Sequence, residues 1–146
     1  AYARKLIRPM AQTLARLGSE KAWLVHGSDG TDELAISGMS WVAMLDEDGA
    51  INDAEIHPED FGLTPYPFEE ILGSTPAENA KALSNLLGGE KSAYREAVLL
   101  NSAAALIVSG KTEDKKEAVD IARYSIDSGS AQYKLDMLVK ITSVAS

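Results

Sequence analysis

A short apolar run that leads into a glycine-spaced acidic segment constrains the fold of this chain more than any other stretch. The segment is Trp23-Leu24-Val25-His26-Gly27-Ser28-Asp29-Gly30-Thr31-Asp32-Glu33. The apolar residues predict a short buried strand over residues 22–26, because Gly27 and Gly30 prevent a helix from continuing through the run. The acidic side chains are then expected in an irregular loop at the carboxyl end of that strand.

Three carboxylates in this loop are the best candidates for chemistry. They belong to Asp29, Asp32 and Glu33, and ligands of open α/β sheets bind at the carboxyl ends of strands. Neighbouring carboxylates on a turn suit Mg²⁺, which takes one or two carboxylates and completes its coordination with water and substrate phosphate oxygens. The residues alone leave two alternatives open, a magnesium site and a solvated acidic loop, and they favour the solvated loop.

The segments on either side of the acidic loop predict a helix and a β-hairpin. Apolar residues recur at helical spacing between Leu6 and Leu17, and Gly18 follows at the position where helices commonly end. Pro9 either kinks this helix or marks its first turn. On the other side, residues 39–56 predict an antiparallel hairpin around the turn 46–49, because two strand-like runs flank an Asp-Glu-Asp-Gly sequence.

Large apolar groups lie on both faces of the first hairpin strand, which indicates a substantially buried strand with Trp41 in the core. His26 and Asn101 are the two polar residues next to apolar stretches that most need an explanation. We interpret His26 as a hydrogen-bonded structural histidine. For Asn101 we favour a helix-to-loop structural hydrogen bond over orientation of a ligand, since a buried amide needs partners.

The rest of the chain predicts an irregular connection followed by four helices. Residues 57–73 are rich in proline, glycine and acids, and we expect Tyr66 and Phe68 to pack this connection onto the domain. Thr75, Ser92, Thr112 and Ser130 are the expected first residues of the helices. The expected buried positions are Ala80, Leu83, Leu86 and Leu87, then residues 97–108, then Ala118, Val119, Ala122 and Ile126, and finally Ala131, Leu135, Leu138 and Val139.

Composition excludes several classes of protein. The sequence has no cysteine, which excludes disulfides, thiol nucleophiles and a cysteine-based zinc site. Its net charge of −8 argues against a nucleic-acid-binding surface, which normally carries a basic patch. No apolar run approaches the ~20 residues that span a bilayer, and residues 1–5 lack the apolar core of a signal peptide. We therefore expect a cytoplasmic protein.

Motifs spread over nearly the whole chain resemble one enzyme family. They are Leu17-Gly18, Leu24-Val25-His26-Gly27, Asp29-Gly30-Thr31-Asp32-Glu33, Pro58-Glu59-Asp60-Phe61-Gly62-Leu63, Ala77-Glu78-Asn79-Ala80, Leu99-Leu100-Asn101-Ser102-Ala103-Ala104-Ala105-Leu106 and Asp127-Ser128-Gly129. In this order and spacing they resemble the C-terminal part of anthranilate phosphoribosyltransferase, an enzyme of tryptophan biosynthesis. Thr31 and Ser102 depart from the family, which more usually has a large apolar residue and alanine there.

The resemblance implies an α/β fold, namely the C-terminal segment of the large domain of nucleoside phosphorylase/phosphoribosyltransferase type, with an incomplete sheet covered by helices. Residues 1–146 would form the C-terminal portion of this single domain. The family's N-terminal helical domain, its glycine-rich phosphate-binding loop and its anthranilate-binding arginine have no counterpart here. We expect the rest of a longer polypeptide to supply the missing strands, because an unpaired sheet edge favours association.

The resemblance also implies a reaction, in which the phosphoribosyl group of phosphoribosyl pyrophosphate passes to the amino group of anthranilate and pyrophosphate leaves. It implies that Asp32 and Glu33 are the ligands of a Mg²⁺ cofactor that offsets the charge on the leaving group, with Ser28 and Asp29 as weaker candidates around them. It assigns no catalytic residue, because an aromatic amine needs only positioning and desolvation.

For the complete enzyme, the expected partners are phosphoribosyl pyrophosphate, anthranilate, the remainder of the polypeptide and a second copy in a homodimer. The isolated chain is expected to be inactive. Two rival classes stay open, a non-catalytic nucleic-acid-binding relative and a nucleoside phosphorylase of the same fold. The net charge and the Asp32/Glu33 pair count against the first, and the motifs around Asp29 and Asn101 fit the second less well.

Overall fold

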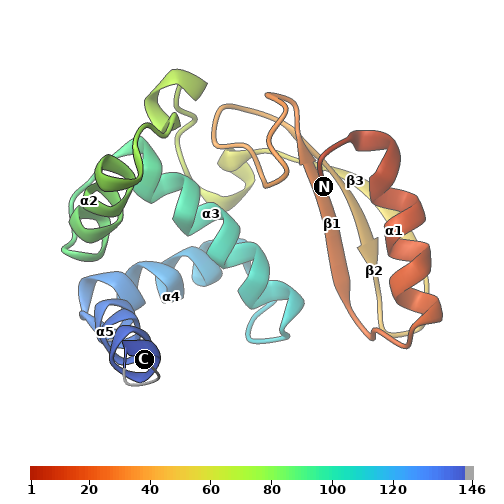
Figure 1. Ribbon diagram of the computed structural model, residues 1–146. Coiled ribbons are helices and arrows are strands. Elements are labelled where there is room, and N and C mark those ends of the chain that lie inside the picture. The colour runs from red at the N-terminus through yellow and green to blue at the C-terminus, as the bar shows by residue number, and fades with distance from the viewer. Residues whose placement is uncertain (144–146) are drawn as a thin grey trace.

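One helix precedes three strands along the chain, and four further helices follow them, in the order that the sequence predicts. The computed structural model describes residues 1–143. The helices are α1 (Arg4–Arg16), α2 (Pro76–Leu87), α3 (Ala93–Val108), α4 (Lys115–Asp127) and α5 (Ser130–Ser143), and the strands are β1 (Ala22–Gly27), β2 (Ser40–Leu45) and β3 (Ile51–Ile56). Helix α1 covers one side of the sheet, and the other helices gather beyond β1 (Figure 1). The expected α/β architecture is therefore confirmed.

The three strands form one antiparallel sheet in the order β1-β2-β3. Val42 of β2 lies opposite Val25 on one side and Ala54 on the other, and a turn closed by Gly49 joins β2 to β3. The predicted hairpin is thus confirmed. Strand β2 is mostly buried, as expected for a strand with apolar groups on both faces.

Successive residues of β2 point to two different clusters, because side chains alternate across a strand. Ala43 packs with Ile7 and Ala11 of α1, while Val42 joins the main core. Trp41, which was expected in the core, is only half-buried, with the Arg4 guanidinium 4.3 Å from the centre of its ring. Pro9 lies inside α1, which begins at Arg4, so it does not mark the first turn.

Strand β1 forms where the sequence predicts a strand, but the expectation that it is buried is wrong. Trp23, Leu24 and Val25 are each half-buried. The reason is the position of β1 at the edge of the sheet, where it pairs with β2 alone among the described residues. No second strand among the described residues pairs with β1, and part of its apolar surface is consequently exposed.

The main core joins the sheet to the helices through the connection that follows β3. Within this connection, two short 3₁₀ turns (Pro58–Phe61 and Phe68–Ile71) replace the fully irregular segment that we expected. Tyr66 packs against the core as expected although it is only half-buried, and Phe61, at 1% exposure, is the most buried aromatic residue of this segment. Phe68 is half-buried and is not among the residues packed on this core. The core cluster comprises Leu34, Ile36, Val42, Ile56, Phe61, Leu63, Leu86, Leu99, Leu100, Ala103, Ala118, Val119, Ala122 and Ile126.

The helix starts follow capping chemistry. Thr75 and Glu78 form the predicted capping box, and Ser92 accepts a hydrogen bond at the start of α3. The predicted start at Thr112 is wrong, because Asp114 caps α4 by accepting from the amides of two residues in its first turn.

The expected burial of the peripheral helices is largely wrong. In α2, Leu86 is buried but Ala80 and Leu83 are exposed, and no described residue of α5 is buried. Each of these helices has few neighbours among the described residues, so their apolar faces stay open. The expected buried positions of α4 are confirmed, whereas α3 is only half-buried over much of its length. None of the helices in residues 4–143 has the length and apolar character that a membrane span requires.

Candidate functional site

The acidic loop after β1 is held together by its own hydrogen bonds. Asp29 is the centre of this network, since its carboxylate accepts from the Thr31 amide at 3.0 Å, the Thr31 hydroxyl at 2.7 Å and the Ser37 hydroxyl at 2.5 Å. The Gly27 amide also donates to the Thr31 carbonyl oxygen at 2.9 Å. These contacts fix the loop as one rigid turn.

Two consequences follow from this packing. Burial raises the pKa of Asp29, but the hydrogen bonds from Ser37 and Thr31 outweigh it, so the pKa lies below its usual value and the carboxylate stays charged. A Cβ atom at Gly27 would lie 2.5 Å from the Thr31 hydroxyl and 2.6 Å from Asp29 Oδ1, so this position requires glycine. The sequence marks Gly27 only as a helix breaker, whereas the structure shows a close approach.

A second anchor lies immediately after the acidic pair. Asn101, in the middle of α3, accepts a hydrogen bond from the Leu34 amide at 2.9 Å and donates one to the Leu34 carbonyl oxygen at 3.0 Å. The predicted helix-to-loop role of Asn101 is therefore confirmed. The Ser40 hydroxyl accepts from the Ala35 amide at 2.8 Å, so the buried segment after the loop is also pinned to the start of β2.

Asp32 and Glu33 lie between these two anchors with exposed side chains. They form one wall of a cleft with a volume of about 540 Å³. The other lining residues are Tyr2, Gly30, Thr31, Phe68, Ile71, Leu72, Gly73, Tyr94, Ala97 and Val98. The structure thus places the predicted acidic pair among the residues that line a largely apolar cleft.

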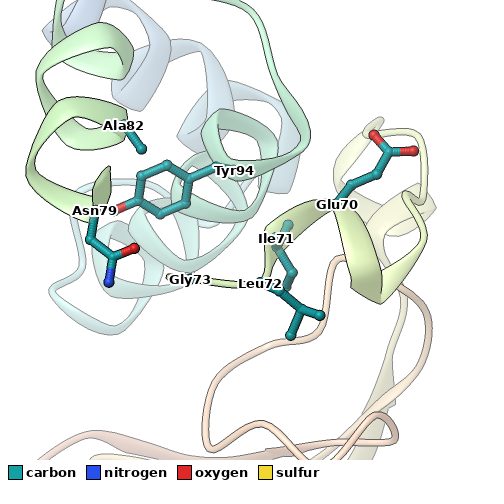
Figure 2. Close-up of a pocket in the computed structure, with 7 residues that line it drawn as sticks. All are labelled: Glu70, Ile71, Leu72, Gly73, Asn79, Ala82 and Tyr94. Atoms are coloured by element: carbon teal, nitrogen blue, oxygen red, sulfur yellow. The ribbon is translucent and has the colours of Figure 1, made fainter. Parts of the chain in front are cut away.

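A smaller cavity of about 310 Å³ adjoins this cleft and shares Ile71, Leu72, Gly73 and Tyr94 with it. Figure 2 shows the Tyr94 ring with Asn79 and Ala82 of α2 on one side and Ile71 and Leu72 on the other. These lining residues were not identified from the sequence, because they come from three separate segments and share no local pattern.

The carboxylate oxygens at the cleft are too few to complete the coordination of a metal ion, but they fit Mg²⁺ when water and a substrate supply the other ligands. Residues 1–143 contain no group of three His, Cys, Asp or Glu side chains arranged to hold a metal ion. Two consecutive exposed carboxylates match the way Mg²⁺ binds through one or two carboxylates, with water and substrate phosphate as its other ligands. Ser28 and Asp29 form no part of the cleft wall, and Asp29 instead supports the loop.

Neither histidine lines the cleft. His26 hydrogen-bonds through Nδ1 to the Ala1 carbonyl oxygen at 2.8 Å, which confirms its predicted structural role, and its ring stacks on Trp41 with 6.1 Å between the ring centres. The backbone amide of His57 donates to Asp60 at 3.0 Å, at the start of a 3₁₀ turn.

The fold is a sheet covered by helices, and the anchored acidic loop lies at the carboxyl end of an edge strand. These features define the general class as an α/β domain with a candidate ligand cleft at the end of a strand. Within that class, residues 1–132 match the family described as "Glycosyl transferase family, a/b domain". The chain therefore belongs to this glycosyl transferase family.

Individual relatives agree with the family assignment. The chain is 48% identical over 141 residues to the anthranilate phosphoribosyltransferase of Xanthobacter autotrophicus, a match that covers 97% of this chain and 41% of the relative. The corresponding enzyme of Rhodopseudomonas palustris is 47% identical over 144 residues, covering 99% of this chain and 42% of the relative. The chain thus spans about two fifths of the length of the curated relatives it matches.

Solved structures give the same result for the fold. The anthranilate phosphoribosyltransferase of Thermus thermophilus has a TM-score of 0.85 and 35% identity, covering 95% of this chain and 40% of that one. The Saccharomyces cerevisiae enzyme in complex with PRPP and Mg has a TM-score of 0.89 and 25% identity, covering 98% of this chain and 41% of that one.

Proposed function

We propose that this chain is the C-terminal portion of the large domain of an anthranilate phosphoribosyltransferase. The complete enzyme transfers the phosphoribosyl group from phosphoribosyl pyrophosphate to anthranilate and yields N-(5-phosphoribosyl)anthranilate and pyrophosphate, a cytoplasmic step of tryptophan biosynthesis. The observation that carries this proposal is 48% identity over 97% of the chain to an enzyme of that name.

In this proposal, Asp32 and Glu33 hold Mg²⁺ together with the pyrophosphate of the donor substrate. Their exposure in the lining of the cleft and the Mg-containing complex of the yeast neighbour support this role. When it is bound, Mg²⁺ supplies neutralisation of the negative charge that develops on the leaving pyrophosphate. The two carboxylates orient this charge, and the rigid turn around Asp29 keeps them in place.

The reaction itself needs little from this chain beyond binding and orientation. The amino nitrogen of anthranilate forms a bond to the anomeric carbon, the bond from that carbon to the pyrophosphate oxygen breaks, and the nitrogen loses a proton. An aromatic amine with a free electron pair reacts once it is positioned and water is excluded. Ala97 and Val98 add apolar surface to the cleft lining, which disfavours water at that part of the site.

We further propose that this chain alone does not catalyse the reaction. Its relatives are more than twice as long, and the open edge of β1 is where the remaining polypeptide would add strands to the sheet. The complete protein is proposed to form a homodimer, with phosphoribosyl pyrophosphate and anthranilate as its ligands.

A chimera tests the function directly. This chain would replace the matching 41% of the Xanthobacter autotrophicus enzyme, and loss of anthranilate fluorescence would report turnover with phosphoribosyl pyrophosphate and Mg²⁺. We expect turnover by the chimera and none by the isolated chain. A folded chimera without activity, beside an active parent enzyme, would contradict the proposed function.

The double change Asp32→Asn and Glu33→Gln in the same chimera tests the metal role. It keeps the size of both side chains but removes two negative charges, so activity should fall at least 10–100-fold, the range found even for residues around metal ligands, and partly recover at high Mg²⁺. A folded double variant with unaltered rates at limiting Mg²⁺ would eliminate Asp32 and Glu33 as metal ligands.

A further inference from the structure

The acidic pair lies between two fixed points of the backbone. On one side, the Thr31 amide is tied to Asp29, and on the other side both polar groups of the Leu34 backbone are tied to Asn101. Within residues 1–143, neither Asp32 nor Glu33 uses its side chain in a hydrogen bond or ion pair. The direction of these two side chains therefore depends on how the backbone around them is held.

The two anchors differ in what they connect. The contact between Asp29 and Thr31 joins residues two positions apart and stabilises only the turn itself. The contact between Asn101 and Leu34 spans 67 positions and joins the loop to α3. Because α3 also lines the cleft through Tyr94, Asn101 fixes the acidic pair relative to the cleft.

A carboxamide side chain can bind both polar groups of the Leu34 backbone at once in the observed geometry. Its oxygen accepts from the Leu34 amide while its nitrogen donates to the Leu34 carbonyl oxygen, and the second hydrogen of that nitrogen serves the Ala97 carbonyl oxygen at 3.1 Å. Alanine provides neither function, and aspartate provides only acceptors. Asn101 thus hydrogen-bonds to both the amide and the carbonyl oxygen of Leu34, the residue after Glu33.

We propose that Asn101 is a positioning residue that sets the orientation of the Asp32/Glu33 pair and thereby the affinity of the site for a divalent cation. The inference rests on the proposed function, because that function makes the pair a metal site. Residues that orient metal ligands from outside the coordination shell change metal affinity by about 10–100-fold when they are replaced. We expect the same range for Asn101→Ala.

The test uses Mn²⁺ with inorganic pyrophosphate as the paramagnetic probe, because the proposed site holds its cation together with pyrophosphate. The readout is the amide spectrum of the chimera with the Xanthobacter autotrophicus enzyme. In the unsubstituted chimera, Mn²⁺ should broaden the amide signals of residues 31–34 selectively, and the concentration at half-broadening reports affinity. Asn101→Ala should raise this concentration by about tenfold or more. Folded and unfolded molecules give separate amide signals. Partial unfolding of a variant therefore lowers the intensity of the folded signals, but the Mn²⁺ concentration at half-broadening can still be measured from them.

Asn101→Asp is a second variant for which the two possible roles of residue 101 predict opposite changes in Mn²⁺ affinity. One role is to position the loop, and the other is to contribute charge. The added negative charge by itself attracts Mn²⁺ and would tighten binding. The new carboxylate oxygen, however, faces the Leu34 carbonyl oxygen in place of a donor, so the loop should shift and binding should weaken. Weaker binding in Asn101→Asp supports positioning, and tighter binding overturns it.

Val119→Ala is the matched control, since Val119 is buried in α4 and does not line the cleft. It should reduce stability without changing the Mn²⁺ midpoint. Unchanged midpoints in both Asn101 variants would overturn the proposal for Asn101. Absence of selective broadening at residues 31–34 in the unsubstituted chimera with pyrophosphate present would instead overturn the metal role in the proposed function, and the inference with it.

Discussion

The ion pair between Arg95 of α3 and Asp127 of α4 should stabilise the fold several times more than the Asp120–Arg123 pair on the surface of α4. The Arg95 side chain is only 4% exposed, and its Nη2 atom donates to Asp127 Oδ1 at 2.7 Å. Its other terminal nitrogen, Nη1, is buried without a partner within residues 1–143. Asp127 is thus the main compensation for a guanidinium that has left water.

Removing one partner of a buried pair typically destabilises by about 3–5 kcal/mol, because a buried charge is left uncompensated. Asp127 is itself 50% exposed, so water reaches part of the pair and the lower end of that range applies. We therefore expect Asp127→Ala to lower the free energy of unfolding by about 3 kcal/mol. At about 2–4 °C per kcal/mol for a chain of this size, Tm should fall by about 6–12 °C.

Asp120→Ala is the control, because Asp120 pairs with Arg123 on the same helix but both side chains are well exposed, at 73% and 40%. Exposed pairs contribute about 0–1 kcal/mol. Urea unfolding and thermal melts of both variants give the comparison. Equal losses in the two variants would refute the argument that burial of Arg95 sets the value of the pair.

Two further predictions concern the acidic loop and helix α2. Gly27→Ala should destabilise the chain by about 1–3 kcal/mol in urea unfolding, because its Cβ would lie 2.5–2.9 Å from three side-chain atoms, whereas Gly38→Ala, whose Cβ has no neighbour nearer than 3.7 Å, should be close to neutral. Hydrogen bonds from Ser74 and Thr75 lower the pKa of Glu78 from 4.5 to about 2. The capping box should therefore stabilise α2 above about pH 4.5 and lose this contribution as the pH falls towards 2; carboxyl NMR titration and melts against Glu78→Gln check this.

Local sequence signals predicted the elements whose structure depends on neighbours in the chain. The hairpin follows from a turn sequence between two apolar runs, and the start of α2 follows from the Thr75 and Glu78 capping box. The Asn101 contact was also predictable, because an amide inside an apolar helix needs partners. The partner itself, the backbone of Leu34, was not predictable, since nothing local connects positions so far apart.

Burial was the weaker part of the prediction, and for a physical reason. Apolar spacing in α5 and in β1 indicates which face of each element is suited to packing, but not whether another segment covers it. In the structure, Leu138 is 58% exposed and Trp23 is half-buried, because the described residues leave those faces open. Thr112 and Asp114 are both capping residue types, and only the geometry shows that Asp114 accepts the amides of the first turn.

The link between Asn101 and Leu34 also ties the order of folding to the formation of the site. Closing a loop of 67 residues carries an entropic penalty that short hairpin and helical contacts do not carry, so this contact forms after local structure exists. The acidic turn can thus assemble early around Asp29, while its fixed placement over the cleft waits for α3 to reach the sheet. We consequently expect a newly made chain to acquire its secondary structure before it acquires the proposed cation site.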